Sequence, residues 1–97
     1  MIQKRITIEN ELGLHARPAA EFVKAASKFK CSVQLAKGVM TPGDEEWVNG
    51  KSVLGILTLA VEQGDSLLLR IEGKGDDREE ERRAFEVLSA ILAGSGT

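Results

Sequence analysis

The spacing of hydrophobic residues changes several times along the chain, and each spacing predicts a different element. Isoleucines alternate with polar residues over 2–8, which is typical of a strand with one buried face. From residue 16 to residue 28 the apolar positions recur at helical spacing, and Pro18 lies near the start, where its missing N–H costs nothing. We therefore expect a strand, a loop over 9–14 and then a helix.

The same patterns continue towards the end of the chain. We expect further strands at 32–37, 47–49 and 66–71, and a short helix that Ser52 opens. Asp76 with Glu79, or Asp77 with Glu80, fits a capping box at the start of a last helix. The apolar positions of that helix are Ala84, Phe85, Leu88, Ile91 and Leu92.

The expected order is β-α-β-β-α-β-α, which favours helices packed on one face of an antiparallel sheet. We therefore predict an α+β fold, an open-faced β-sandwich with three helices on one face of a four-stranded antiparallel sheet and the other face in water. Residues 1–93 are expected to form a single domain, and 94–97 a flexible tail. Residues 38–46 include Thr41-Pro42-Gly43-Asp44, which predicts an exposed loop between the second and third strands.

Composition and charge mainly exclude classes of protein. The chain has 97 residues, 42% of them hydrophobic, and a net charge of −2, so it lacks the strongly basic character of nucleic-acid-binding domains. Cys31 is the only cysteine, which allows no intrachain disulfide and favours a reducing compartment. The first residues, 1–5, are not followed by the apolar region that a signal peptide needs, and the longest largely apolar stretch, 53–61, is too short to span a membrane. We expect a cytoplasmic protein with no nucleic-acid partner and no membrane insertion.

Charged residues give no indication of a metal site. One histidine and one cysteine without clustered carboxylates at ligand spacing do not predict metal binding. The acidic run over 76–81 is interpreted as a solvated helix start, since negative charge suits the first turn of a helix. The sequence also has no glycine-rich nucleotide loop, and no cofactor is expected.

His15, the only histidine, is the strongest candidate for chemistry because it directly precedes the first predicted helix. The free N–H groups of Ala16 and Arg17, together with the helix dipole, predict an anion site there. The guanidinium of Arg17 adds a fixed charge that suits phosphate oxygens. A neutral imidazole can accept a phosphoryl group in such a place. A lone histidine at a helix start can equally be a capping or packing residue, and these residues alone leave both interpretations open.

Two separate motifs resemble one known family. Residues 11–19, Glu-Leu-Gly-Leu-His-Ala-Arg-Pro-Ala, resemble the active-site signature of HPr, the histidine-containing phosphocarriers of the bacterial phosphotransferase system. Residues 48–55, Val-Asn-Gly-Lys-Ser-Val-Leu-Gly, resemble the segment around the regulatory serine of that family. The resemblance covers essentially the whole chain. It departs from the family at the stretch before Val48, which is longer than usual and ends in Trp47, a residue that we expect to pack over the sheet edge.

The resemblance implies a function for each motif. His15 would take a phosphoryl group on Nδ1 from enzyme I, charged from phosphoenolpyruvate, and pass it to IIA proteins or domains, with Arg17 assisting. Ser52 would be the position that HPr kinase/phosphorylase modifies. The protein would then be a carrier in sugar transport and regulation rather than an enzyme with independent turnover, and we expect a monomer. Two alternatives remain: a regulatory module that docks to transcription regulators, and a carrier of the nitrogen-related branch.

Several residues have both a structural and a functional interpretation. Ser52 fits an N-cap of the short helix as well as a modification site. Val53, Leu54 and Leu57 exceed what one side of a short helix must bury, so they predict either core packing or an exposed partner patch. Lys24 and Lys28 on the first helix could meet an acidic partner or only face solvent. We assign six residues to a candidate partner interface: Leu14, Lys24, Lys28, Val53, Leu54 and Leu57.

Overall fold

The computed structural model describes residues 1–38, 41 and 43–93. The predicted tail at 94–97 and part of the predicted loop at 38–46 lie outside the described residues. The elements, in chain order, are β1 (Ile2–Thr7), α1 (Ala16–Ala26), β2 (Ser32–Lys37), β3 (Val48–Asn49), α2 (Val53–Leu57), β4 (Ser66–Glu72), a 3₁₀ turn (Lys74–Asp76) and α3 (Arg78–Leu92).

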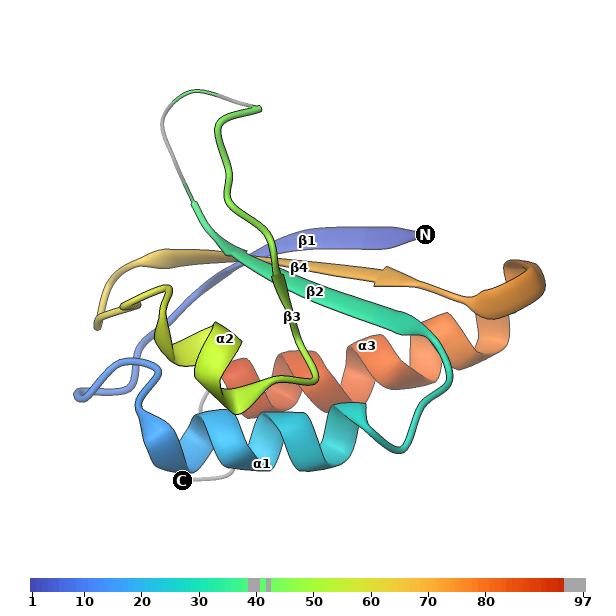
Figure 1. Ribbon diagram of the computed structural model, residues 1–97, viewed down its shortest axis with the longest axis horizontal. Helices are drawn as coiled ribbons and strands as arrows, with labels where there is room; N and C mark the ends of the chain where they lie inside the picture. Colours follow the sequence, from blue (N-terminus) through green and yellow to red (C-terminus); the bar gives the residue numbers. More distant parts are fainter. Residues whose placement is uncertain (39–40, 42, 94–97) are drawn as a thin grey trace.

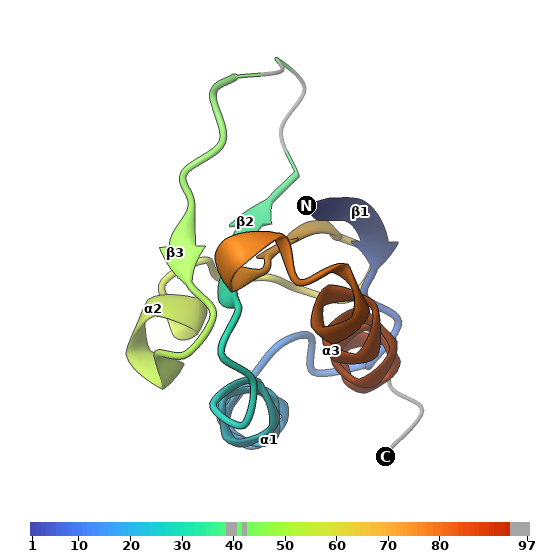
Figure 2. The same ribbon diagram turned by 90° about the vertical axis from the view of Figure 1, so that its right-hand side faces the viewer.

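The strands form one antiparallel sheet in the order β1-β4-β2-β3. β4 lies between the first two strands, and Ile71 pairs with Ile2 on one side and Val33 on the other. The three helices lie on the same side of this sheet (Figure 1; Figure 2). The predicted open-faced α+β sandwich is therefore confirmed.

The main core lies between the sheet and the helices. Alternate residues of β4, Leu67, Leu69 and Ile71, are fully buried on the face that the helices cover. Phe22 from α1 and Leu88 from α3 fill the same layer and are also fully buried. Complete burial of a large apolar side chain stabilises the fold by about 1.5–3 kcal/mol, so these positions hold α1 and α3 on the sheet.

The boundaries of β1, α1, β3 and β4 differ from the prediction by one or two residues, and those of β1 and α1 have a clear cause. β1 ends at Thr7, yet Ile8 is 1% exposed and its N–H bonds to the carbonyl of Asp65 at 3.0 Å. α1 ends at Ala26 rather than Lys28, because the chain tightens into a turn in which Lys28 N–H bonds to Ala25 O at 3.1 Å. Such tightened last turns satisfy carbonyls that the helix leaves free.

The two alternative caps of α3 are resolved in favour of Asp77. Its carboxylate accepts the N–H of Glu80 at 3.1 Å, whereas Asp76 belongs to the preceding 3₁₀ turn. Of the predicted apolar face of α3, Ala84, Leu88 and Leu92 are buried, and Phe85 and Ile91 pack partly buried against the core.

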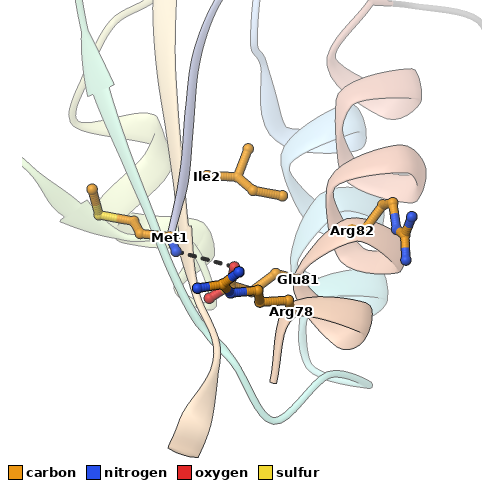
Figure 3. A pocket seen from close by; sticks show the side chains of 5 residues that line it. All are labelled: Met1, Ile2, Arg78, Glu81 and Arg82. Atoms are coloured by element: carbon orange, nitrogen blue, oxygen red, sulfur yellow. Dashed lines mark ion pairs between the residues drawn. The ribbon is translucent and has the colours of Figure 1, made fainter. Parts of the chain in front are cut away.

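We expected residues 76–81 to form a solvated helix start, but Glu81 is buried. It is 3% exposed, and its carboxylate accepts the N–H of Gly73 at 2.6 Å and lies 3.1 Å from the amino group of Met1. These groups lower the pKa of the Glu81 carboxyl, the Gly73 hydrogen bond most of all. Figure 3 shows the ion pair in a hollow of about 590 Å³, whose lining also includes Ile2, Arg78 and Arg82. Glu81 therefore joins α3 to the end of β4.

The outer face of the sheet is less exposed to water than predicted. Ala36 and Leu68 lie on this face by alternation with the core residues, and they are 0% and 6% exposed. Trp47, just before β3, reaches across β2 to Arg70 of β4, whose guanidinium lies 3.8 Å from the centre of the indole ring. Trp47 thus packs over the outer face of the sheet rather than only at its edge.

Candidate functional site

The loop that carries His15 is held by the segment between α2 and β4. Leu14 N–H bonds to Val61 O at 3.0 Å, and Gly13 N–H closes a turn onto Asn10 O at 2.9 Å. Gly13 has φ 66°, and a Cβ at this position would collide with the carbonyl oxygen of Val61. Only glycine therefore lets the loop approach this segment closely enough to place the next residues at the start of α1.

His15 is the N-cap residue of α1, with φ −89° and ψ −173°, and its carbonyl accepts the N–H of Ala19 at 3.1 Å. Its imidazole does not bond to the N–H groups of the first turn, and the side chain is half-buried. Within the described part of the chain, no group accepts a hydrogen bond from the N–H of Ala16 or Arg17. The start of α1 is thus open, although a serine or aspartate there would close it.

Arg17 supplies the positive charge of this site. Its side chain is exposed on the first turn of α1, where there is no acidic residue, and it forms no ion pair with any residue that the structure describes. A free guanidinium and two free N–H groups beside an imidazole form a ready environment for a tetrahedral anion. Such fixed donors are what phosphoryl transfer mainly requires of a protein.

Ser52 lies at the start of α2 and is engaged there. Its Oγ accepts the N–H of Gly55 at 3.0 Å, so the predicted N-cap is confirmed. The next residue back, Lys51, was not predicted to have a role, yet its Nζ donates to Phe29 O at 2.8 Å and ties this end of α2 to the end of α1. The sequence pattern gave no signal for this long-range bond.

The candidate interface residues separate into exposed and buried sets. Leu54 is 75% exposed and Leu57 36% exposed on α2, whereas Val53 packs partly buried against the core. Leu14 is 6% exposed and belongs to the core cluster, so its assignment to a partner interface is wrong. Lys24 and Lys28 are exposed near the end of α1.

An exposed leucine that we did not predict lies close to His15 in the chain. Leu12, three residues before it, is 72% exposed. α2 packs against α1, so Leu54 and Leu57 lie on the helix next to the one that His15 caps (Figure 1). The exposure of Leu12 could have been predicted from the sequence. It is an apolar residue in a loop, next to Gly13, and the spacing of residues 9–14 does not predict that it is buried.

Other chemistry finds little support in the described residues. They contain no group of three or more histidine, cysteine, aspartate or glutamate residues that could hold a metal ion. None of their helices is long and apolar enough to cross a membrane. Cys31 is fully buried, and burial, followed by the charge of Glu80, raises the pKa of its thiol, which makes it a poor nucleophile.

Comparisons with known proteins all match the same family. The family model of the PTS HPr component phosphorylation site matches residues 2–93. The phosphocarrier protein HPr of Xylella fastidiosa is 38% identical over 92 residues, which cover 95% of this chain and 91% of the relative. The crystal structure of HPr from Bacillus anthracis superposes with a TM-score of 0.75 at 34% identity, covering 94% of this chain and 95% of that one.

A regulatory relative is also similar. The crystal structure of Crh from Bacillus subtilis, a catabolite repression protein solved as a domain-swapped, intertwined dimer, has a TM-score of 0.63 and 35% identity. The match covers 95% of this chain and 93% of the Crh chain.

Proposed function

Since this chain belongs to the PTS HPr family of phosphocarriers, we propose that it accepts a phosphoryl group from phosphorylated enzyme I on Nδ1 of His15 and passes it to IIA proteins. The observation that carries the proposal is the uncapped start of α1. His15 is its N-cap residue, and among the described residues neither the N–H groups of Ala16 and Arg17 nor the guanidinium of Arg17 has a hydrogen-bond or ion-pair partner. The chain acts as a relay in the cytoplasm, with a covalent phosphohistidine and no independent turnover.

The transfer balances without a cofactor. The lone pair of Nδ1 forms the new P–N bond while the bond between phosphorus and the donor nitrogen breaks, and the reverse occurs at the acceptor. The N–H groups of Ala16 and Arg17 and the guanidinium stabilise the charge on the phosphoryl oxygens. Because these donors are already free, no cap has to be displaced when the phosphoryl group arrives.

Docking is proposed to use the exposed apolar side chains of α2 and the nearby loop. Leu54, Leu57 and Leu12 supply the apolar surface, and the exposed part of Val53 adds to it. Lys24 and Lys28 would meet acidic residues of the partner at the rim. Enzyme I and the IIA proteins must use this surface in turn, which fits a monomer that exchanges partners.

Regulation through Ser52 is a second proposed function, carried by its position as the cap of α2 beside this apolar surface. HPr kinase/phosphorylase would modify it, and the modified form would dock to transcription regulators. A solely regulatory relative could dispense with the histidine, so His15 and Arg17 favour the carrier role. The sequence Lys51-Ser52-Val53-Leu54-Gly55 favours the sugar branch over the nitrogen-related branch.

The test uses enzyme I, phosphoenolpyruvate and three forms of the protein: the natural chain, His15→Ala and Ser52→Ala. Intact mass spectrometry should show one added phosphoryl group on the natural chain and on Ser52→Ala, lost in acid and kept in base. His15→Ala should gain none. Labelling that survives the His15→Ala change would falsify the assignment.

A further inference from the structure

The segment over 60–65, between α2 and β4, supports the loop that carries His15. Val61 O accepts the N–H of Leu14 at 3.0 Å, directly before His15, and Gln63 Nε2 donates to Glu9 O at 3.2 Å. Gly13 packs against the backbone of the same segment without room for a Cβ. The backbone that leads into His15 therefore depends on the shape of residues 60–65.

This segment begins at a residue in an unfavourable conformation. Ala60 has φ 52°, and it is the only non-glycine residue with positive φ in the described part of the chain. A residue with a Cβ keeps such a conformation only when its surroundings hold it there. The Nζ of Lys37, at the end of β2, donates to the carbonyl of Ala60 at 3.3 Å.

The same ammonium group also holds the other end of the segment. Lys37 Nζ lies 3.3 Å from Oδ2 of Asp65, and that oxygen accepts the N–H of Glu62 at 2.8 Å. The Glu62 hydrogen bond and then Lys37 lower the pKa of the Asp65 carboxyl, so the carboxylate is charged near neutral pH. One lysine thus joins both ends of the segment, while Asp65 fixes its middle.

The surroundings of Lys37 reinforce this arrangement. Its backbone is anchored by pairing with Leu67 of β4. A hollow of about 210 Å³ beside it is lined by Lys37, Asp44, Glu46, Thr58 and Leu59. Lys37 thus shares this hollow with two acidic residues, Asp44 and Glu46, in addition to its ion pair with Asp65.

We propose that Lys37 is a positioning residue for phosphoryl transfer: by bridging Ala60 O and Asp65, it keeps the 60–65 segment in the shape that places the Leu14 backbone and, through it, the imidazole of His15. Lys37 touches neither His15 nor the phosphoryl group. The inference rests on the proposed role of His15 as phosphoryl acceptor, and it assigns the support of that histidine to a side chain from another strand.

The experiment compares Lys37→Met, which removes the charge, with Lys37→Arg, which can still bridge, and with Lys30→Met as a matched control. Lys30 is exposed and lies in the connection between α1 and β2, on the opposite side of Figure 1 from the His15 loop. Each form is measured for kcat and KM as a substrate of enzyme I, for thermal melting, and for NMR shifts of the Leu14 amide and the His15 ring.

Lys37→Met should lower kcat by about threefold to thirtyfold with little change in KM, because misplacement by about 1 Å can cost up to about a hundredfold. The Leu14 and His15 signals should move in Lys37→Met, and Lys37→Arg should restore most of the rate. Lys30→Met should match the natural chain.

Other outcomes would contradict the role of Lys37, or would show that the proposed function has failed and not the role of Lys37. Equal kcat for Lys37→Met and Lys30→Met would overturn it, as would a lower melting temperature with an unchanged rate. If the natural chain took no phosphate, the proposed function would fail, and the NMR shifts alone would decide the positioning role. Unmoved Leu14 and His15 signals in Lys37→Met would then reject it.

Discussion

The first and second helices of this protein begin in opposite ways. At α2, the hydroxyl of Ser52 accepts the N–H of Gly55 at 3.0 Å and closes the start of the helix. At α1, His15 occupies the same N-cap position, but its ring caps no N–H group, and Pro18, at the place that Gly55 takes in α2, has none to offer. Among the described residues, nothing accepts the N–H groups of Ala16 and Arg17. α3 resembles α2, because Asp77 accepts the N–H of Glu80.

The difference fits the proposed role of α1, in which the helix gives up a stabilising cap and keeps donors for a phosphoryl group. A capping side chain stabilises a helix by about 0.5–2 kcal/mol. α1 lacks this contribution, and instead carries an imidazole, a free guanidinium and unoccupied donors that a phosphoryl group can use. An uncapped helix start indicates a functional site when the other helices on the same sheet are capped, since the fold itself does not require the missing cap.

Arg17→Gly gives the largest effect and would deepen the contrast between the two helix starts. Removing the guanidinium should slow transfer to His15 by one or more orders of magnitude, as loss of a charge-stabilising group typically does. Its melting temperature should barely change, because the side chain is exposed and forms no ion pair within the part of the chain that the structure describes. Stopped-flow transfer rates and thermal melts check this, with Arg17→Lys as the control that keeps the charge but loses the fork. Normal transfer with a large loss of stability would reverse the assignment.

Ser52→Asp tests whether the closed helix start also controls docking. A negative charge there suits the helix dipole, and the carboxylate can accept the N–H of Gly55 in place of the hydroxyl, so the fold should be kept. The charge lies beside Leu54 and Leu57, which must lose water on docking, and an acidic partner would repel it. The initial rate of His15 phosphorylation by enzyme I should therefore fall, and more so with phosphoserine. Equal rates for both forms would leave Ser52 as a helix cap only.

Ser52→Ala tests the cap without adding charge. The N–H of Gly55 loses its acceptor, so the free energy of unfolding should fall by about 1 kcal/mol. The rate of His15 phosphorylation should stay unchanged, since the start of α1 is untouched. Urea unfolding measures the first effect, and an unchanged unfolding free energy would show that the hydroxyl contributes no cap.

Glu81→Gln is expected to act through pH. Because the folded protein lowers the pKa of this carboxyl, its charge contributes stability in full above the ordinary glutamate value of about 4.3. That contribution is lost as the pH falls through the lower pKa of the folded state. The stability difference between the natural chain and Glu81→Gln should therefore be largest near neutral pH and shrink in acid, with His15 phosphorylation unaffected. A difference that does not vary with pH would contradict the account.

Much of the fold follows from local patterns in the sequence. Alternating isoleucines gave β1, helical spacing gave α1 and α3, and Ser52 marked the start of α2. The features that were missed depend on distant partners. Glu81 is buried because Gly73 and the amino group of Met1 meet it, and Leu68 is buried on a face where Trp47 and Arg70 stack. No spacing within one element could have predicted either.

The site shows the same division. His15, Arg17 and the cap at Ser52 could be placed from their positions at helix starts, since an N-cap is a local feature. Leu14, which we assigned to a partner interface, is buried in the core, and its N–H bonds to Val61 O, a distant partner that the loop sequence does not reveal. Lys37 was missed for the same reason, because its partners lie 23 and 28 residues further along the chain.

The central claim is that the start of α1 stays open so that its N–H groups can hold the phosphoryl group. The most direct test compares the amide NMR signals of the phosphorylated and unphosphorylated protein. The signals of Ala16 and Arg17 should shift strongly on phosphorylation, while those of Gly55 and Glu80, which already have acceptors, should stay nearly unchanged. A protein that carries the phosphoryl group on His15 without any shift at Ala16 and Arg17 would contradict the account.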